Sequence, residues 1–108
     1  MRVDALAAEC GFKVICAPDG EREVLGVYVG DLLSWVMGRA KQDDAWITIM
    51  SNINVIAVAS LSDVSCVIFS EGVMPENSVI ETARAKGINL ISSPLSSYEV
   101  AVKLSGIL

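Results

Sequence analysis

The chain has 108 residues, a length that accommodates one hydrophobic core and predicts a single domain spanning residues 1–108. Hydrophobic residues make up 53% of it, yet no apolar run approaches the ~20 residues of a membrane span and charges interrupt the first twenty positions, so we expect a cytoplasmic protein without membrane contact. The net charge is −5 and the eight basic residues are dispersed, which argues against nucleic-acid binding.

The first thirty residues predict one helix and two strands. The helix begins near Asp4 and ends at Gly11, because glycine is the usual residue just past a helix end. Residues 12–17 then predict a strand that stops at residues 18–20, where proline and glycine favour a turn. We expect the next apolar run, residues 23–29, to return as the hairpin partner of this strand.

Residues 31–39 predict a second helix with a broad apolar surface. Its apolar side chains cover about 200° of arc, roughly twice what one core contact requires. We expect one half to face the core and the other half to form the subunit interface of a homodimer. The predicted interface residues are Leu32, Leu33, Trp35, Val36 and Met37.

The rest of the chain alternates between strands and helices. Strands are predicted at residues 45–50, 65–69 and 89–92, and each is followed by a helix. The last helix begins with Ser96 and Glu99 at the spacing of a capping box. Strand–helix–strand units of this length form parallel sheets. We therefore predict an α/β fold: a small domain of two or three layers whose mostly parallel sheet is built from consecutive βαβ units, plus an N-terminal helix and strands.

Polar side chains follow each of these three strands. The carboxyl ends of parallel strands share one edge of a sheet, so the loops are expected to line a common site for a small ligand. The candidate ligand-binding residues are Ser51, Asn52, Asn54, Ser70, Glu71, Gly72, Ser92, Ser93 and Ser96. The alternative is a structural role, because the same residue types cap helices and form turns. The carboxylate of Glu71 disfavours the binding of a phosphate at this helix start. Its own partner is then a ribose hydroxyl, a cationic group or solvent.

The composition removes most catalytic chemistry. The chain has no histidine, and therefore lacks the commonest general acid–base group and transition-metal ligand. Cys10, Cys16 and Cys66 form no C-x-x-C pair and lie in apolar surroundings, which predicts reduced structural thiols. Neither a P-loop nor a dinucleotide-binding fingerprint is present. We expect no catalytic residue, no metal and no cofactor.

Residues 47–104 resemble the DRTGG domain, and the likeness extends with lower specificity over the whole chain. In that family an Asp-Arg pair follows one strand and Thr-Gly-Gly follows the next. The corresponding residues here are Asn52-Ile53 and Ser70-Glu71-Gly72. The surrounding frame is closer to the family, at residues 56–61, 67–69, 75, 83–87 and 96–99.

The resemblance carries functional implications. DRTGG domains occur as regulatory modules in phosphate acetyltransferases and in CBS-containing pyrophosphatases, and they resemble the N-terminal domain of HPr kinase/phosphorylase, whose kinase activity belongs to a separate P-loop domain. Residues 26–34 are similar to small stand-alone DRTGG proteins, which often accompany iron–sulfur hydrogenase genes.

Together with the broad apolar helix, this resemblance predicts a non-catalytic regulatory or accessory module. We expect a homodimer that acts through protein–protein contact, with a partner in a hydrogenase or iron–sulfur context, and that responds to a ligand. The alternative is a sensor of small, nucleotide-like molecules that bind at the carboxyl-edge loops.

Overall fold

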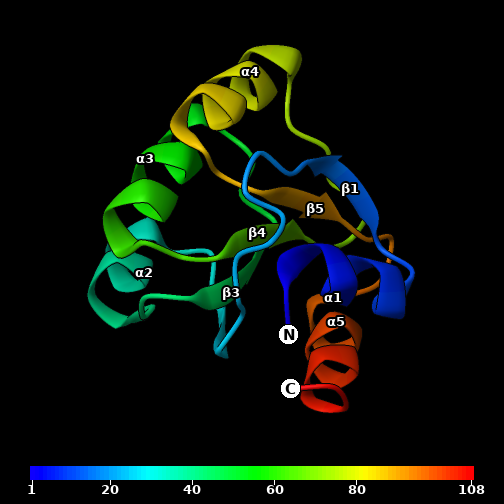
Figure 1. Cartoon of the computed structure of the whole chain (residues 1–108). Helices are drawn as coiled ribbons and strands as arrows, with labels where there is room; N and C mark the ends of the chain where they lie inside the picture. The colour runs from blue at the N-terminus through cyan, green and yellow to red at the C-terminus, as the bar shows by residue number, and fades with distance from the viewer.

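A five-stranded sheet forms the centre of the protein, in the order β1-β5-β4-β3-β2. The computed structural model describes residues 1–108 (Figure 1). The strands are β1 (Lys13–Cys16), β2 (Gly26–Val29), β3 (Asp44–Thr48), β4 (Cys66–Phe69) and β5 (Leu90–Ser92). Strands β2 to β5 are parallel, whereas β1 pairs antiparallel with β5. The predicted mostly parallel sheet is confirmed.

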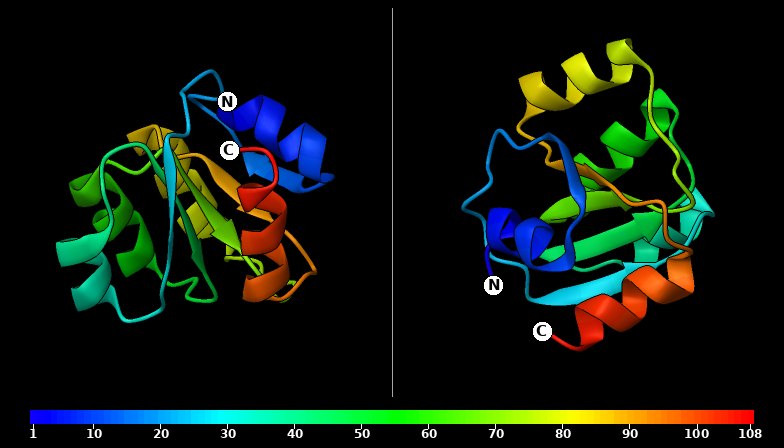
Figure 2. Two further views of the ribbon diagram at one scale, coloured as in Figure 1. Left: turned by 90° about the horizontal axis from the view of Figure 1, so that it is seen from below. Right: turned by 90° about the vertical axis from the view of Figure 1, so that its right-hand side faces the viewer.

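Helices cover both faces of this sheet, so the domain has three layers rather than two (Figure 2). Helices α2, α3 and α4 pack on one face, and α1 and α5 pack on the other. Their bounds are α1 (Val3–Cys10), α2 (Leu33–Arg39), α3 (Ile53–Ser62), α4 (Asn77–Lys86) and α5 (Ser97–Ser105).

The central strands bury side chains on both faces. Trp46 and Phe69 point into the core beneath α2, α3 and α4, while Ile47 and Ile68 point into the core beneath α1 and α5. All residues of β3, β4 and β5 are buried. This burial explains why their sequences read as continuous apolar runs, as parallel strands covered on both faces do.

Local signals set the ends of several helices as predicted. Gly11 and Gly87 follow α1 and α4 in the left-handed conformation, with φ of 70° and 73°. At the start of α5, the Ser96 hydroxyl accepts from the Glu99 N–H, and the Glu99 carboxylate accepts from the Ser96 N–H. These interactions satisfy backbone groups that a helix end leaves without partners.

The predicted hairpin between the first two strands is wrong. β1 pairs with β5, with Lys13 opposite Ser92, and β2 lies at the other edge of the sheet beside β3. Asn89 holds the intervening turn in place, because its side chain accepts from the Asp19 N–H at 2.9 Å and donates to the Asp19 carbonyl at 2.8 Å. The strand that pairs with β1 therefore lies 74–79 residues away in sequence, in place of the adjacent β2.

Candidate functional site

The loops that leave β2, β3, β4 and β5 lie at one edge of the sheet, because these four strands are parallel. We call this edge the carboxyl rim. The predicted convergence of three loops is met, and the loop after β2 joins them. Asp31 in that loop accepts from the Thr48 hydroxyl at 2.8 Å and from the Ile49 N–H at 2.9 Å, so it positions the loop after β3. In the sequence, Asp31 is only the first residue of the predicted helix 31–39, and nothing there indicates this role.

The first predicted loop has accessible polar side chains. Asn52 and Asn54 are exposed and Ser51 is partly buried. The Asn52 side chain accepts from the Asn54 N–H at 2.9 Å and so caps the start of α3. The side-chain oxygen of Asn52 therefore caps α3, while the side-chain nitrogen of this exposed residue has no protein partner.

The second and third loops are bonded to each other. The Glu71 N–H donates to the Leu95 carbonyl at 2.7 Å, and the Gly72 N–H donates to the Ser93 carbonyl at 2.9 Å. The hydroxyls of Ser70 and Ser97 lie 2.7 Å apart. These contacts hold the two loops as one unit beside the sheet.

Several predicted ligand contacts are enclosed within this unit. Ser70, Ser92 and Ser93 are buried, and the Ser93 hydroxyl accepts from the Leu95 N–H at 3.1 Å. Ser96 is used by the capping box. These four residues have structural roles, because their side chains are buried or bonded within the loops. Glu71 and Gly72 remain exposed at the rim.

Glu71 and Gly72 both have left-handed backbones, with φ of 58° and 71°. In the DRTGG motif these two places are glycines, which adopt this conformation without steric cost. A glutamate there is strained, since a side chain in the left-handed region costs roughly 1–2 kcal/mol. The Glu71 and Gly72 N–H bonds to the neighbouring loop explain why the conformation persists.

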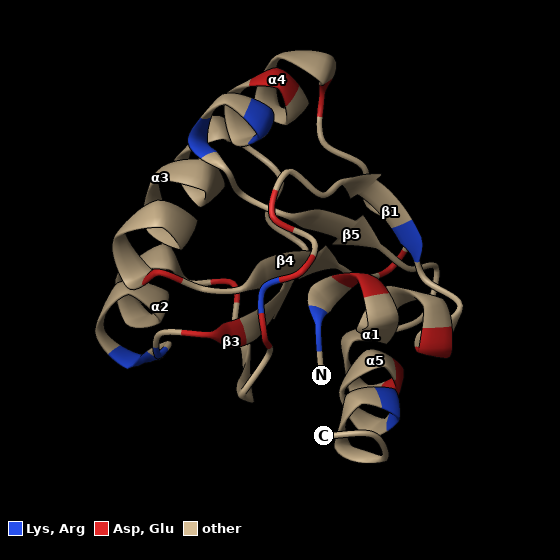
Figure 3. Cartoon of the chain, in the orientation of Figure 1, with Lys and Arg blue, Asp and Glu red and all other residues tan.

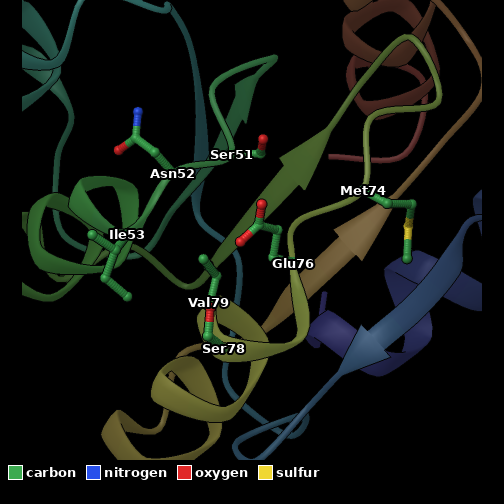
Figure 4. A pocket seen from close by; sticks show the side chains of 7 residues that line it. All are labelled: Ser51, Asn52, Ile53, Met74, Glu76, Ser78 and Val79. Carbon is green, nitrogen blue, oxygen red and sulfur yellow. The ribbon is translucent and has the colours of Figure 1, made fainter.

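The accessible part of the rim contains a cavity of about 510 Å³ between the starts of α3 and α4 (Figure 4). Its lining residues come from two facing segments: Ser51, Asn52, Ile53, Met74, Glu76, Ser78 and Val79. Only Ser51 and Asn52 of these were predicted. The sequence does not indicate the α4 side, because the motif residues stand at the beginning of the loop between β4 and α4. The residues that line the cavity come from the end of that loop and the start of α4.

The cavity lining limits the ligand chemistry. It combines one carboxylate, from Glu76, with hydroxyls and one amide, and no Lys or Arg lines it. A carboxylate without a nearby cation repels anions and accepts hydrogen bonds from hydroxyl or amino groups. The geometry therefore suits a small molecule that presents hydrogen-bond donors. No cluster of three His, Cys, Asp or Glu side chains could hold a metal ion.

The three cysteines are buried and unbridged. Burial raises the pKa of the Cys66 thiol to about 12, and it also raises the pKa values of Cys10 and Cys16. The thiolate is the nucleophilic form of cysteine. These side chains are therefore neutral packing groups near neutral pH, as predicted.

The predicted interface helix divides into two sets. Leu32, Trp35 and Met37 are exposed, and Leu33 is partly buried and packs against the core. Val36 is fully buried and is not accessible to a partner. The Arg39 guanidinium lies 3.9 Å from the centre of the Trp35 ring, a cation–π contact that holds this indole on the surface.

A known protein family matches nearly the whole chain. The model described as "DRTGG domain" matches residues 5–107. The chain belongs to the DRTGG domain family. Among curated proteins, none has a significantly similar sequence. The residues of this DRTGG domain at the family's Asp-Arg place, Asn52 and Ile53, both line the cavity.

A solved structure shares the fold. It is the crystal structure of the CBS and DRTGG domains of the regulatory region of Clostridium perfringens pyrophosphatase, complexed with its activator, diadenosine tetraphosphate. The TM-score is 0.75 at 17% sequence identity, over 95% of this chain and 45% of that chain. This DRTGG chain thus spans less than half the length of that chain. No helix here has the length and apolarity to cross a membrane.

Proposed function

We propose that this DRTGG chain is one domain that acts as a non-catalytic regulatory module, through a homodimer and contact with partner proteins. The observation that carries the proposal is the exposed apolar surface of residues 25–37, which includes Leu32, Trp35 and Met37. Exposed apolar side chains that gather on one side of a protein mark interaction sites. The pyrophosphatase region of the same fold is described as regulatory, which supports this role.

Sedimentation equilibrium of the purified chain tests the dimer. We expect a mass of twice 11.5 kDa at micromolar concentrations. We also expect Trp35→Ser to weaken association by at least about tenfold, because exposed tryptophans in interfaces are frequent hot spots. Leu61→Ser, at an apolar residue on α3 that is more exposed than Trp35, is the control and should leave the mass unchanged. A monomer at all concentrations contradicts the proposal.

A second candidate function is the sensing of a small, nucleotide-like molecule at the carboxyl rim. The cavity between α3 and α4 supports it, because Asn52, Ser78 and Glu76 together recognise hydroxyl and amino groups of the kind that ribose and bases carry. The absence of basic side chains in the lining favours contact with the nucleoside part over the phosphates.

A thermal-shift panel of adenine and uridine nucleosides and nucleotides tests the sensor. A ligand present at a hundred times its Kd adds ~2.7 kcal/mol of stability. We expect nucleosides to stabilise the protein at least as well as their phosphates, and Glu76→Gln to reduce the shift. Glu81→Gln, on the exposed side of the same helix, is the control. No shift with any compound contradicts this candidate.

Three narrower expectations remain predictions. The resemblance to stand-alone DRTGG proteins implies a partner from a hydrogenase or iron–sulfur system. We also expect a cytoplasmic location. Lack of catalytic activity follows from a composition without histidine and from thiols that burial keeps neutral. Co-purification with a tagged chain from its native host, followed by mass spectrometry, would test the partner.

A further inference from the structure

The two edge strands of the sheet differ in how they are protected against pairing with another strand. β1 begins with a charged residue, Lys13, and its register shifts between Val14 and Cys16 as in a β-bulge (Figure 3). Pro18 follows two residues later. Lysine, proline and bulges on an edge strand all oppose further strand pairing. The β1 edge is therefore blocked.

β2 has none of these features. Residues 24–30 contain no charge and no proline, and β2 pairs only with β3. Its Val27 and Val29 side chains are 37% and 48% exposed. An edge strand leaves a row of backbone groups without partners, and an uncharged, β-branched edge is a template for another strand.

The backbone of β2 shows which groups point outward. The Gly30 N–H, just past the strand, donates to the Ile47 carbonyl at 3.1 Å in the register of the β2–β3 pair, so Gly30 faces β3. Backbone groups alternate in direction along a strand of a parallel pair. Val27 and Val29, at odd spacing from Gly30, therefore direct their N–H and carbonyl groups away from β3 toward the open edge.

The apolar surface of β2 continues onto α5, which contacts both β2 and β3 (Figure 2, right). Val100 and Leu104 of α5 are buried against the sheet. Tyr98 and Val102 lie on the opposite, solvent-facing side of α5 at helical spacing, and they are 78% and 49% exposed. They extend the exposed apolar surface beside β2.

We propose that two copies of this chain pair through β2, antiparallel about a two-fold axis, so that their sheets join into one ten-stranded sheet. The inference rests on the homodimer proposed above and names its contact. A two-fold axis brings the same strand against itself, so the uncharged stretch meets its own uncharged copy. Each copy carries a net charge of −5, and contact through this stretch keeps the repelling charges outside the interface.

The strand alone is too small for a stable interface. A standard interface takes about 800 Å² from each partner, or 20–30 residues, whereas β2 has four residues. The flanking side chains supply the remainder: Tyr98 and Val102 on the α5 side, and the exposed residues of α2 on the other face of the sheet. The proposed contact therefore has backbone pairing at its centre and apolar side chains on both sides.

Lysine substitutions at the two edges test the pairing. Val27→Lys places like charges across the two-fold axis, and we expect it to raise the dimer Kd by at least about tenfold, because like-charge contacts in interfaces are strongly unfavourable. Val14→Lys on β1, at a residue 44% exposed, is the matched control and should leave Kd unchanged. Circular dichroism verifies that both variants fold.

Residue-resolved amide hydrogen exchange of the wild-type chain gives a measurement without substitutions. We expect exchange at the Val27 and Val29 N–H groups to slow as the concentration rises through the dimer Kd, while the amides of β1 show no such dependence. If the wild type dimerises but Val27→Lys and Val14→Lys have equal Kd values and the exchange of Val27 and Val29 is independent of concentration, the β2 pairing is wrong and the dimer stands. If the wild type stays monomeric, both are wrong.

Discussion

The two ends of the parallel strands use similar polar residues for different purposes. At the amino end, Asn89 is 1% exposed and all its side-chain bonds are internal. At the carboxyl end, Asn52 is exposed, and its side-chain oxygen accepts from the Asn54 N–H at the start of α3. An asparagine beside a strand thus has a structural or an accessible role according to its burial. The buried polar groups at the amino end therefore stabilise the fold, whereas the carboxyl rim leaves polar groups accessible.

The largest effect is expected at Asn89. Its side chain bonds the Asp19 N–H, the Asp19 carbonyl and the Ser65 carbonyl at 2.8–2.9 Å. Asn89→Ala leaves the buried Ser65 carbonyl and the partly buried Asp19 groups without these partners, at ~1–3 kcal/mol for a fully buried group and less for a partly buried one. We expect a loss of about 3 kcal/mol in urea unfolding. Asn52→Ala is the matched control and should cost about 1 kcal/mol, the usual value of a helix cap. Equal losses would contradict the comparison.

The second effect concerns Arg22 at the amino end. Its guanidinium bonds the carboxylates of Asp43 and Asp63 at 2.9 Å, and it also donates to the Asp63 carbonyl. Burial lowers the pKa of Arg22, but these hydrogen bonds outweigh it and raise the pKa overall.

We expect Arg22→Met to lower the free energy of unfolding by about 2 kcal/mol. The value is below the 3–5 kcal/mol of a fully buried pair because the Arg22 side chain is 21% exposed. Arg84→Met, which removes the exposed pair with Glu81, should change stability by less than about 1 kcal/mol. If Arg22→Met lowers the free energy of unfolding by no more than Arg84→Met does, the proposed contribution of the amino end to stability is wrong.

The third effect is a dependence of folding stability on pH that arises from Cys66, the first residue of β4. Burial raises its pKa to about 12, while an unfolded thiol ionises near ~8.5. Between these values the unfolded state binds fewer protons than the folded state, so stability falls as pH rises, by up to ~1.4 kcal/mol per pH unit. Unfolding midpoints measured from about pH 8 to pH 11 should show this slope. Cys66→Ala should reduce the slope, with Cys10 and Cys16 supplying the remainder, and an unchanged slope would reject the assignment.

The smallest effect is expected at the carboxyl rim. Glu71 has φ of 58°, and glycine relieves that strain. We expect Glu71→Gly to stabilise the protein by about 1 kcal/mol, since the strain of ~1–2 kcal/mol is offset in part by the flexibility of glycine in the unfolded chain. Gly72→Ala, at φ of 71°, should destabilise it by a similar amount. Destabilisation by Glu71→Gly would show that the glutamate side chain makes a contribution larger than the strain.

One side of the candidate site could be foreseen because parallel strands place their exits at one edge. Asn52 and Ser51 follow β3 and line the cavity, as expected. Ser70 and Ser93 are the same residue type at equivalent places, but the bonds between their two loops bury them. That burial depends on how closely the loops approach one another, which residue type does not encode. The position of Glu76 in the cavity lining likewise depends on where the end of its loop lies in the fold, which residue type does not encode.

The amino-acid order by itself determined the helix ends at Gly11 and Gly87, the capping box and the succession of βαβ units, because these depend on backbone conformation and on contacts within a few residues. Only the tertiary structure decided where the two outer strands lie. Local signals predicted that residues 12–17 and 23–29 pair, yet β5 binds the first and β3 binds the second. Pairing across the sheet won because it buries the strands' apolar side chains against helices, while the local turn bonds to Asn89 instead of closing a hairpin.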